Sequence, residues 1–179
     1  MRGVDWIMDG GALSVDFVNT LRDRWSDVPR ETLPTSRSMI GWMQSAGVAV
    51  SSSADADYST ALALRGALEA LFEHRASAAE IALINDLSRD APRATLVGAG
   101  TDITAKIDAP ASFRGALGQI AADAVTLATN GLLPRVTVCH HERCGLLFVD
   151  TSRGRRRQWC SMQRCGNRAK VARFQERHR

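Results

Sequence analysis

The first 138 residues of this 179-residue chain contain no cysteine, and the whole chain contains only four. It also lacks a long apolar run: no segment approaches the roughly 20 apolar residues that a membrane-spanning helix needs. The N-terminal stretch MRGVDWIMDGG has no apolar core of the length that a secretory signal requires. We therefore expect a cytoplasmic protein that has no membrane partner.

Motifs for catalysis are missing as well. The sequence shows no Ser-His-Asp order, no glycine-rich phosphate loop and no pair of carboxylates at a useful spacing. We therefore expect that the chain is not an enzyme.

Charge is distributed unevenly along the chain. Residues 135–179 hold 12 Lys and Arg against 3 Asp and Glu, which gives this tail a charge of +9, whereas the other 134 residues carry −5. A basic tail on an acidic body is typical of proteins that bind a polyanion, usually nucleic acid. A solvated basic tail without a partner is the alternative that charge alone leaves open.

The body of the chain predicts a mainly α fold with one small β-hairpin. Apolar residues make up 45% of the sequence, enough for a core. Alternation in Thr95–Val97 and Ile103–Ile107 around GAGTD predicts the hairpin, and Leu13–Phe17 predicts a short extended segment that runs into a helix. The expected helices are one capped by Thr35 or Ser36 and ending near Gly47, one from about Tyr58 to Arg75, one behind the capping box Ser77–Glu80, and a long one that carries Leu117 to Leu127 and stops at Asn130-Gly131. The shift in charge predicts two domains, 1–134 and 135–179.

Two polar residues interrupt the apolar stretch LSVDFVNTL. Asp16 and Asn19 predict a cap or a buried hydrogen bond that fixes the start of a helix. A small effector pocket lined by these two side chains is the alternative.

The four cysteines follow the pattern C-x4-C-x15-C-x4-C, with Cys139, Cys144, Cys160 and Cys165 in two close pairs. Two close pairs separated by a medium loop are typical of a structural zinc site, and four thiolates leave no open position for catalysis. The alternatives are two disulfides, a redox pair, or replacement of one cysteine ligand by His140 or His141. We predict one structural Zn²⁺ ion.

The residues around the cysteines predict a hairpin and a helix. GLLFVD (residues 145–150) and RQWCS (157–161) are expected to be the two strands, joined by a turn that contains Gly154. A helix capped by Asn167 should follow Cys165, and Trp159, Phe148 and Phe174 should form a small core. This order of elements predicts a treble-clef-like finger.

The tail resembles the CGNR zinc finger, and the start of the chain resembles the ABATE domain that precedes such fingers. The N-terminal likeness lies in LSVDFVNTL, where Val15 replaces the usual leucine. The resemblance implies a helical domain followed by a zinc finger in a bacterial stress-induced transcription regulator. The matching residues of the tail are Cys139, Cys144, Phe148, Asp150, Ser152, Arg153, Arg157, Trp159, Cys160, Ser161, Cys165, Gly166, Asn167, Arg168 and Lys170.

Basic side chains of the tail are the candidate nucleic-acid contacts, because arginine forks match phosphate oxygens and guanine edges. Hydrogen bonds to the zinc-bound sulfurs are an equal alternative for Arg157 and Arg168. The candidates are Arg153, Arg155, Arg156, Arg157, Arg164, Arg168, Lys170 and Arg173.

These patterns together predict a DNA-binding regulator whose N-terminal domain senses a signal or mediates oligomerisation. A small-molecule effector and a homo-oligomer are both compatible with this expectation. A protein-interaction module or an RNA-binding module with a structural zinc is the alternative.

Overall fold

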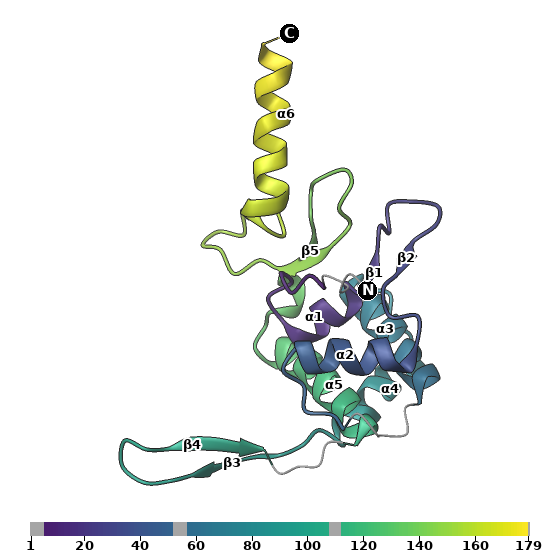
Figure 1. The fold of residues 1–179 in the computed structure, drawn as a ribbon, viewed down its shortest axis with the longest axis vertical. Coiled ribbons are helices and arrows are strands. Elements are labelled where there is room, and N and C mark those ends of the chain that lie inside the picture. Colours follow the sequence, from purple (N-terminus) through teal and green to yellow (C-terminus); the bar gives the residue numbers. More distant parts are fainter. Residues whose placement is uncertain (1–5, 52–56, 108–111, 179) are drawn as a thin grey trace. The chain divides into compact units, whose positions relative to one another are not determined.

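The structure is a computed structural model that describes residues 6–51, 57–107 and 112–178 (Figure 1). The chain forms two compact units: one contains residues 1–32 and 127–179, and the other contains residues 33–126. Within the described residues, the strands form three two-stranded antiparallel sheets and the other regular elements are helices. The predicted mainly α fold is confirmed.

The unit of residues 33–126 is built from helices whose starts the sequence specifies. The side chain of Ser77 forms the predicted capping box, and Thr35, one of the two predicted caps of its helix, forms a capping box as well. Gly47 and Gly131 follow two of the helices with positive φ values of 75° and 65°. The elements are α2 (Ser36–Ser45), α3 (Tyr58–Phe72), α4 (Ala78–Ser88), β3 (Ala94–Val97), β4 (Thr104–Ile107) and α5 (Phe113–Thr129), whose last turn belongs to the other unit.

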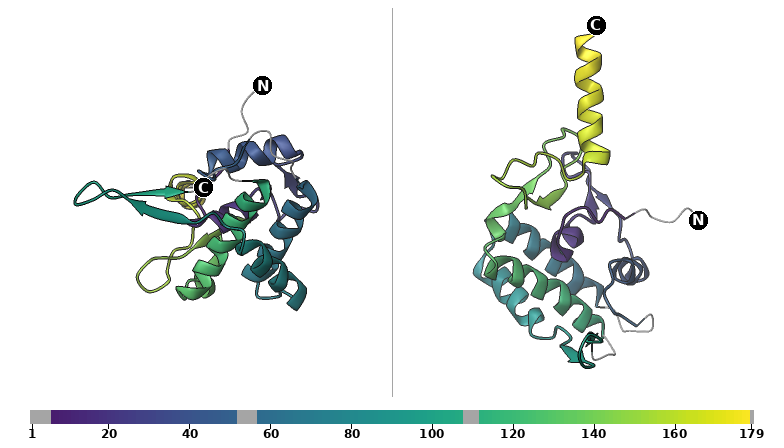
Figure 2. Two further views of the ribbon diagram at one scale, coloured as in Figure 1. Left: turned by 90° about the horizontal axis from the view of Figure 1, so that it is seen from below. Right: turned by 90° about the vertical axis from the view of Figure 1, so that its left-hand side faces the viewer.

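Helix α5 lies very close to the end of α4. A Cβ atom on Gly118 would lie 2.6 Å from the backbone nitrogen of Ala91 and 2.8 Å from the carbonyl oxygen of Leu87, so only glycine fits there. The guanidinium of Arg114 spans the same contact, with bonds of 2.7 Å to Asp86 and 2.6 Å to Asp90. The hairpin β3–β4 extends away from these helices (Figure 2), and every residue of β3 is exposed.

The second unit begins with a short helix rather than the expected extended segment. Helix α1 (Leu13–Val18) begins directly at Leu13, and its residues from Ser14 to Val18 are all buried. A helix that is buried on every side shows no helical period in its sequence. Leu13, Val15 and Phe17 therefore gave the alternating pattern that is typical of a strand. The prediction for Leu13–Phe17 was wrong for this reason.

The finger and the N-terminal segment share this unit. Its remaining elements are β1 (Leu21–Arg22), β2 (Arg30–Glu31), a 3₁₀ turn η1 (Leu133–Arg135), β5 (Val136–Val138), β6 (Leu147–Val149), a π turn η2 (Met162–Gly166) and α6 (Asn167–Arg177).

Strand β6 pairs with β5 on one edge and with the N-terminal segment on the other. The carboxamide of Asn19 donates to the carbonyl of Leu147 at 2.8 Å and accepts from its amide at 2.9 Å. Beside it, the amide of Val149 donates to the carbonyl of Gly10 at 2.8 Å. The buried carboxylate of Asp16 accepts from the amide of Gly10 at 2.7 Å, which fixes that loop. Asp16 and Asn19 therefore make buried hydrogen bonds, which confirms the first of the two expectations for these residues.

The expected return strand at residues 157–161 does not form. Both edges of β6 are occupied, by β5 through the register Val138↔Leu147 and by Asn19 and Gly10. The hairpin of the finger is therefore β5–β6, and the first cysteine pair lies between its strands. Sequence reasoning missed β5 because this strand precedes the first cysteine, whereas the hairpin was expected after Cys144.

Within the described residues, no helix has both the length and the apolar character needed to cross a lipid bilayer.

Replacing Asn19 by alanine should lower the free energy of unfolding by about 2–4 kcal/mol, because it leaves the amide and the carbonyl of Leu147 unpaired in the interior. Chemical denaturation followed by fluorescence measures this loss. Asn130→Ala removes the same side chain from an exposed position and should change stability by less than about 0.5 kcal/mol. Equal effects of the two substitutions would contradict a structural role for Asn19.

Candidate metal centre and nucleic-acid interface

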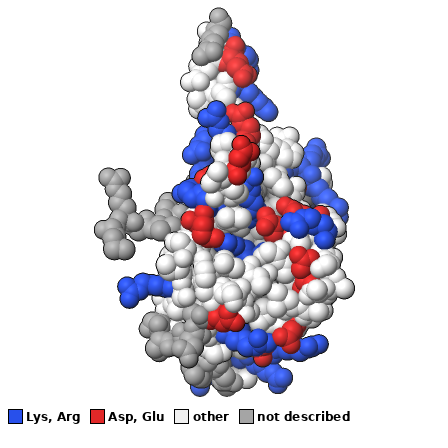
Figure 3. Space-filling view, turned by 90° about the vertical axis from the view of Figure 1, so that its right-hand side faces the viewer, with Lys and Arg blue, Asp and Glu red and all other residues white. Residues whose placement is uncertain are grey.

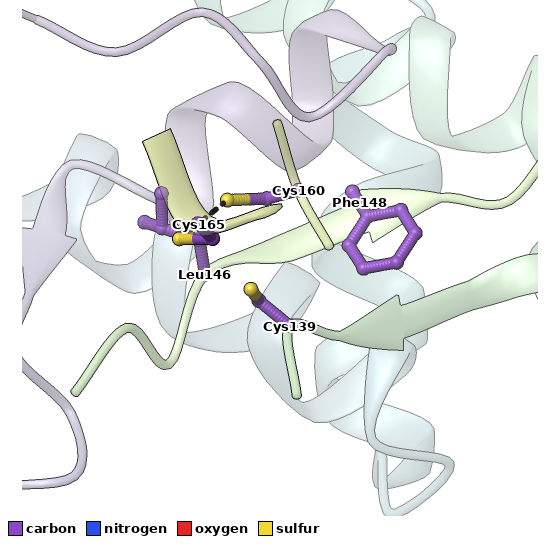
Figure 4. Close-up of a cluster of buried hydrophobic side chains, with 5 residues drawn as sticks. All are labelled: Cys139, Leu146, Phe148, Cys160 and Cys165. Atoms are coloured by element: carbon purple, nitrogen blue, oxygen red, sulfur yellow. Dashed lines mark hydrogen bonds between the residues drawn. The ribbon is translucent and has the colours of Figure 1, made fainter. Parts of the chain in front are cut away.

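The four cysteines come together at one point of the finger. Cys139 and Cys144 lie in the turn between β5 and β6, while Cys160 precedes η2 and Cys165 lies within it. All four sulfur atoms lie within 4.8 Å of one another. The Sγ atom of Cys160 is 3.6 Å from that of Cys144 and 3.6 Å from that of Cys165. Cys139, Cys160 and Cys165 are buried beside Leu146 and Phe148 (Figure 4).

These distances fit a zinc ion. Tetrahedral coordination with zinc–sulfur bonds of about 2.3 Å places the sulfur atoms about 3.8 Å apart. No disulfide joins the cysteines, which are all free thiols. Neither His140 nor His141 belongs to the cluster. The four cysteines therefore form a site for one structural zinc ion, as predicted.

The thiols also need a cation in order to ionise together. The hydrogen bond with Cys160 lowers the pKa of the Cys144 thiol to about 5. The same hydrogen bond raises the pKa of the Cys160 thiol, and burial raises the pKa of the Cys165 thiol to about 12. Of these three thiols, the protein alone favours ionisation of Cys144, and a divalent cation supplies the charge that stabilises the thiolates of Cys160 and Cys165.

Gly166 lets the chain turn tightly around the last ligand. A Cβ atom there would lie 2.6 Å from the sulfur of Met162 and 3.3 Å from Cδ1 of Trp159. The amides of Cys165 and Gly166 both donate to the carbonyl of Ser161, at 3.0 Å and 3.1 Å. The small size of Gly166 thus leaves room for the flexible Met162 side chain and for Trp159 beside η2.

Two local predictions about this region were wrong. Asn167 is not the N-cap: α6 continues directly from η2, with Gly166 before it and no side-chain cap. Phe174 does not join the core, because 56% of its surface is exposed, whereas Phe148 is buried and Trp159 packs against the cysteine cluster as expected. Apolar residues at helical spacing indicated a buried face that α6 does not have.

A buried carboxylate holds the arginine-rich loop of residues 152–157. One oxygen of Asp150 accepts from the amide of Ser152 at 2.8 Å, and the other accepts from the amide of Arg157 at 3.1 Å. Hydrogen bonds from Ser152 are the main reason that the pKa of Asp150 is lowered. Both ends of the loop are therefore fixed by one side chain that is only 4% exposed.

The candidate basic residues fall into two groups. Arg157 and Arg164 make contacts inside their unit. Arg157 lies over the ring of Phe148, with 4.6 Å from Cζ to the ring centre, and donates to the carbonyls of Trp159 and Cys160, while Arg164 forms an ion pair with Asp9. The exposed group consists of Arg153, Arg155, Arg156, Arg168, Lys170 and Arg173. No side-chain hydrogen bond to a cysteine sulfur from Arg157 or Arg168 occurs in the described part of the chain.

Sequence reasoning left Arg177 out of the candidate contacts. Lys170, Arg173 and Arg177 are three and four residues apart, so they share one face of α6. The spacing of these three residues in the sequence could have identified Arg177 as a member of this basic face.

The hairpin, the cysteine cluster and the helix that follows it define a four-cysteine zinc finger protein. Residues 135–178 match the CGNR zinc finger. Residues 11–131 match the ABATE family, described as "Putative stress-induced transcription regulator". Since this second match covers more than half of the chain, the protein belongs to the ABATE family, and both resemblances are confirmed. No curated protein matches the chain.

The family ranges and the compact units divide the chain differently. Residues 11–32 lie within the ABATE match and pack in the same unit as the finger. The boundary near residue 134 stays a prediction.

The purified protein should contain one zinc ion per chain, measured by elemental analysis. Cys160→Ser and Cys165→Ser should each lose it, because three thiolates leave the tetrahedral site incomplete. His140→Ala and His141→Ala are the matched controls and should keep it. Metal loss in either histidine variant would show that the ligand set differs from the four cysteines.

Asp150→Ala should free the arginine loop. Cleavage by trypsin after Arg153, Arg155 or Arg156 should become several-fold faster, because local opening of the loop controls access of the protease. Cleavage after Arg89, in the other unit, serves as the control within the same sample. Unchanged cleavage of the loop would show that Asp150 does not hold it.

Proposed function

We propose that this protein regulates transcription by binding DNA through its zinc finger. The observation that carries the proposal is α6, an 11-residue helix without a single buried residue. It extends away from the rest of its unit (Figures 1 and 2). A helix that is exposed on all sides is free to enter the major groove of a duplex, which is wide enough to admit it.

The charge of α6 supports this role. The helix contains four basic residues and one acidic residue, Glu176. Lys170, Arg173 and Arg177 line one face, where their side chains can reach phosphates or base edges. Basic side chains are visible along α6 and around its base in Figure 3, with a few acidic ones among them.

The arginine loop supplies a second set of contacts in the proposal. Arg153, Arg155 and Arg156 are exposed and have no carboxylate partner among the described residues. Because Asp150 fixes both ends of the loop, the loop backbone loses less entropy when these side chains bind a phosphate. Their role in the proposal is to hold the DNA backbone while α6 lies in the groove.

One observation favours a second candidate, docking of α6 onto another protein. Val171 and Phe174 are 55% and 56% exposed and lie three residues apart on the helix. A partner with an apolar groove and an acidic rim would fit them and the adjacent basic face. RNA is a further polyanion that the same charges could bind.

The rest of the chain has a supporting role in this proposal. We assign it no catalysis and a cytoplasmic location, where its thiols stay reduced and free to bind zinc. The helical unit of residues 33–126 would sense an effector or join two copies of the protein.

DNA binding should weaken steeply with salt. Each phosphate contact contributes about 0.9 to the slope of log affinity against log salt concentration. Changing Arg153, Arg155 and Arg156 together to alanine should lower the magnitude of this slope by roughly 2–3. Fluorescence anisotropy with a mixed-sequence duplex, repeated from low to physiological salt, measures it.

The control is the triple variant Arg37→Ala, Arg89→Ala and Arg93→Ala, which removes the same charge from exposed positions of the other unit. It should keep the wild-type slope. No binding at low salt, or the same slope change in both triple variants, would refute the proposed interface. Tighter binding of single-stranded RNA than of duplex DNA would favour the RNA alternative.

A further inference from the structure

A pocket lined by arginines lies at the base of α6, within the unit that holds the finger. Its volume is about 130 Å³. The N-terminal segment contributes Arg22, the first cysteine turn contributes Arg143, and the last part of the chain contributes Arg164 and Arg168. Three segments distant in sequence therefore bring four guanidinium groups to one small cavity.

The carboxylates near the pocket are already paired. Asp9 pairs with Arg164, and Asp23 accepts from Nε of Arg30 at 2.9 Å. Within the described residues, Arg22, Arg143 and Arg168 have no carboxylate partner. The pocket thus has more positive than negative charge on its side chains.

Among the arginines of the pocket, Arg22 has a buried N–H donor that lacks a hydrogen-bond acceptor in the described part of the chain. Its Nε atom is buried and has no hydrogen-bond partner among the described residues. Burial lowers the pKa of its guanidinium and the charges of Arg30 and Arg164 lower it further, whereas the charges of Asp23 and Cys144 raise it. A buried donor without an acceptor costs free energy, which a bound anion would recover.

Balancing the charge of the zinc site is the competing explanation for these arginines. Cys144, Cys160 and Cys165 also line the pocket, and a zinc ion with four thiolates carries a formal charge of −2. Hydrogen bonds from N–H groups to sulfur would add the most direct stabilisation of that charge, and Arg22 already interacts with the charge of Cys144. In the described part of the chain, however, no hydrogen bond joins Arg22, Arg143 or Arg168 to a cysteine sulfur. Their guanidinium groups are therefore available to another acceptor.

We propose that this pocket binds one phosphate group. Its volume corresponds to about four water molecules, which is enough for a group with four oxygens. Arginine forks bind two oxygens of a phosphate at once, and several forks can surround it. The group comes either from free inorganic phosphate or from a nucleic-acid backbone. Phosphate binding does not require that the protein bind DNA.

The first experiment measures the thermal stability of the full-length, zinc-loaded protein in inorganic phosphate and in chloride at equal ionic strength. A free-phosphate site predicts a Tm that is higher by at least about 3 °C at saturating phosphate. Arg22→Gln should abolish this rise, and so should Arg143→Gln, which tests the site if the first variant folds poorly. Arg93→Gln removes an equal charge from an exposed position outside the pocket and should keep the rise.

The second experiment uses the same variants with a mixed-sequence duplex. If the phosphate belongs to a nucleic acid, Arg22→Gln should weaken binding at least tenfold more than Arg93→Gln does, without a rise of Tm in free phosphate. If the protein binds no DNA, the proposed function fails and the first experiment still decides this site.

Three results would overturn the proposal. One is a phosphate-induced rise of Tm that persists in both pocket variants, since the anion then binds elsewhere. Another is the absence of that rise together with equal effects of Arg22→Gln and Arg93→Gln on DNA binding. The last is loss of zinc from Arg22→Gln with no effect on either ligand, which would assign the arginines to the metal site.

Discussion

The pairing of the Asn19 carboxamide with the backbone N–H and C=O of one residue, Leu147, connects most features of the finger. Asn19 takes the place of a neighbouring strand for Leu147, and the carbonyl of Gly10 does the same for Val149. These bonds fix β6, which carries Phe148 into the cysteine cluster and ends next to Asp150. Asp150 in turn fixes the arginine loop. The conformation of the loop therefore depends on residues more than 100 positions earlier in the chain.

The zinc site has a different mechanical role. Helix α6 has no buried residue, so it gains little from packing along its length. Its orientation is set at its start, where Cys165 is a metal ligand and Gly166 packs against Met162 and Trp159. The metal thus supplies the rigidity that a hydrophobic core usually supplies, which leaves the helix surface free for a partner.

The sequence predicted the zinc ligands and the helices of residues 33–126 correctly, because both depend on local patterns. Ligand spacing identifies the cysteines, and capping boxes at Thr35 and Ser77 mark helix starts. What it could not predict depends on contacts between distant segments. The carboxamide of Asn19 excludes a return strand, and Arg22 and Arg143 meet only in the folded unit. Neither contact leaves a periodic signal in the chain.

The edge of β6 that the N-terminal segment covers determines whether the finger can fold as a separate module. In the intact protein, Asn19 and Gly10 cover the hydrogen-bonding groups of Leu147 and Val149. A finger transplanted onto another protein without these residues would present that edge to solvent, where uncovered strands add to other strands and aggregate. The folded finger therefore consists of two stretches that are far apart in the sequence, the C-terminal residues and the N-terminal segment. Any recombination that moves the finger must also carry the N-terminal segment, or supply a substitute for its carboxamide.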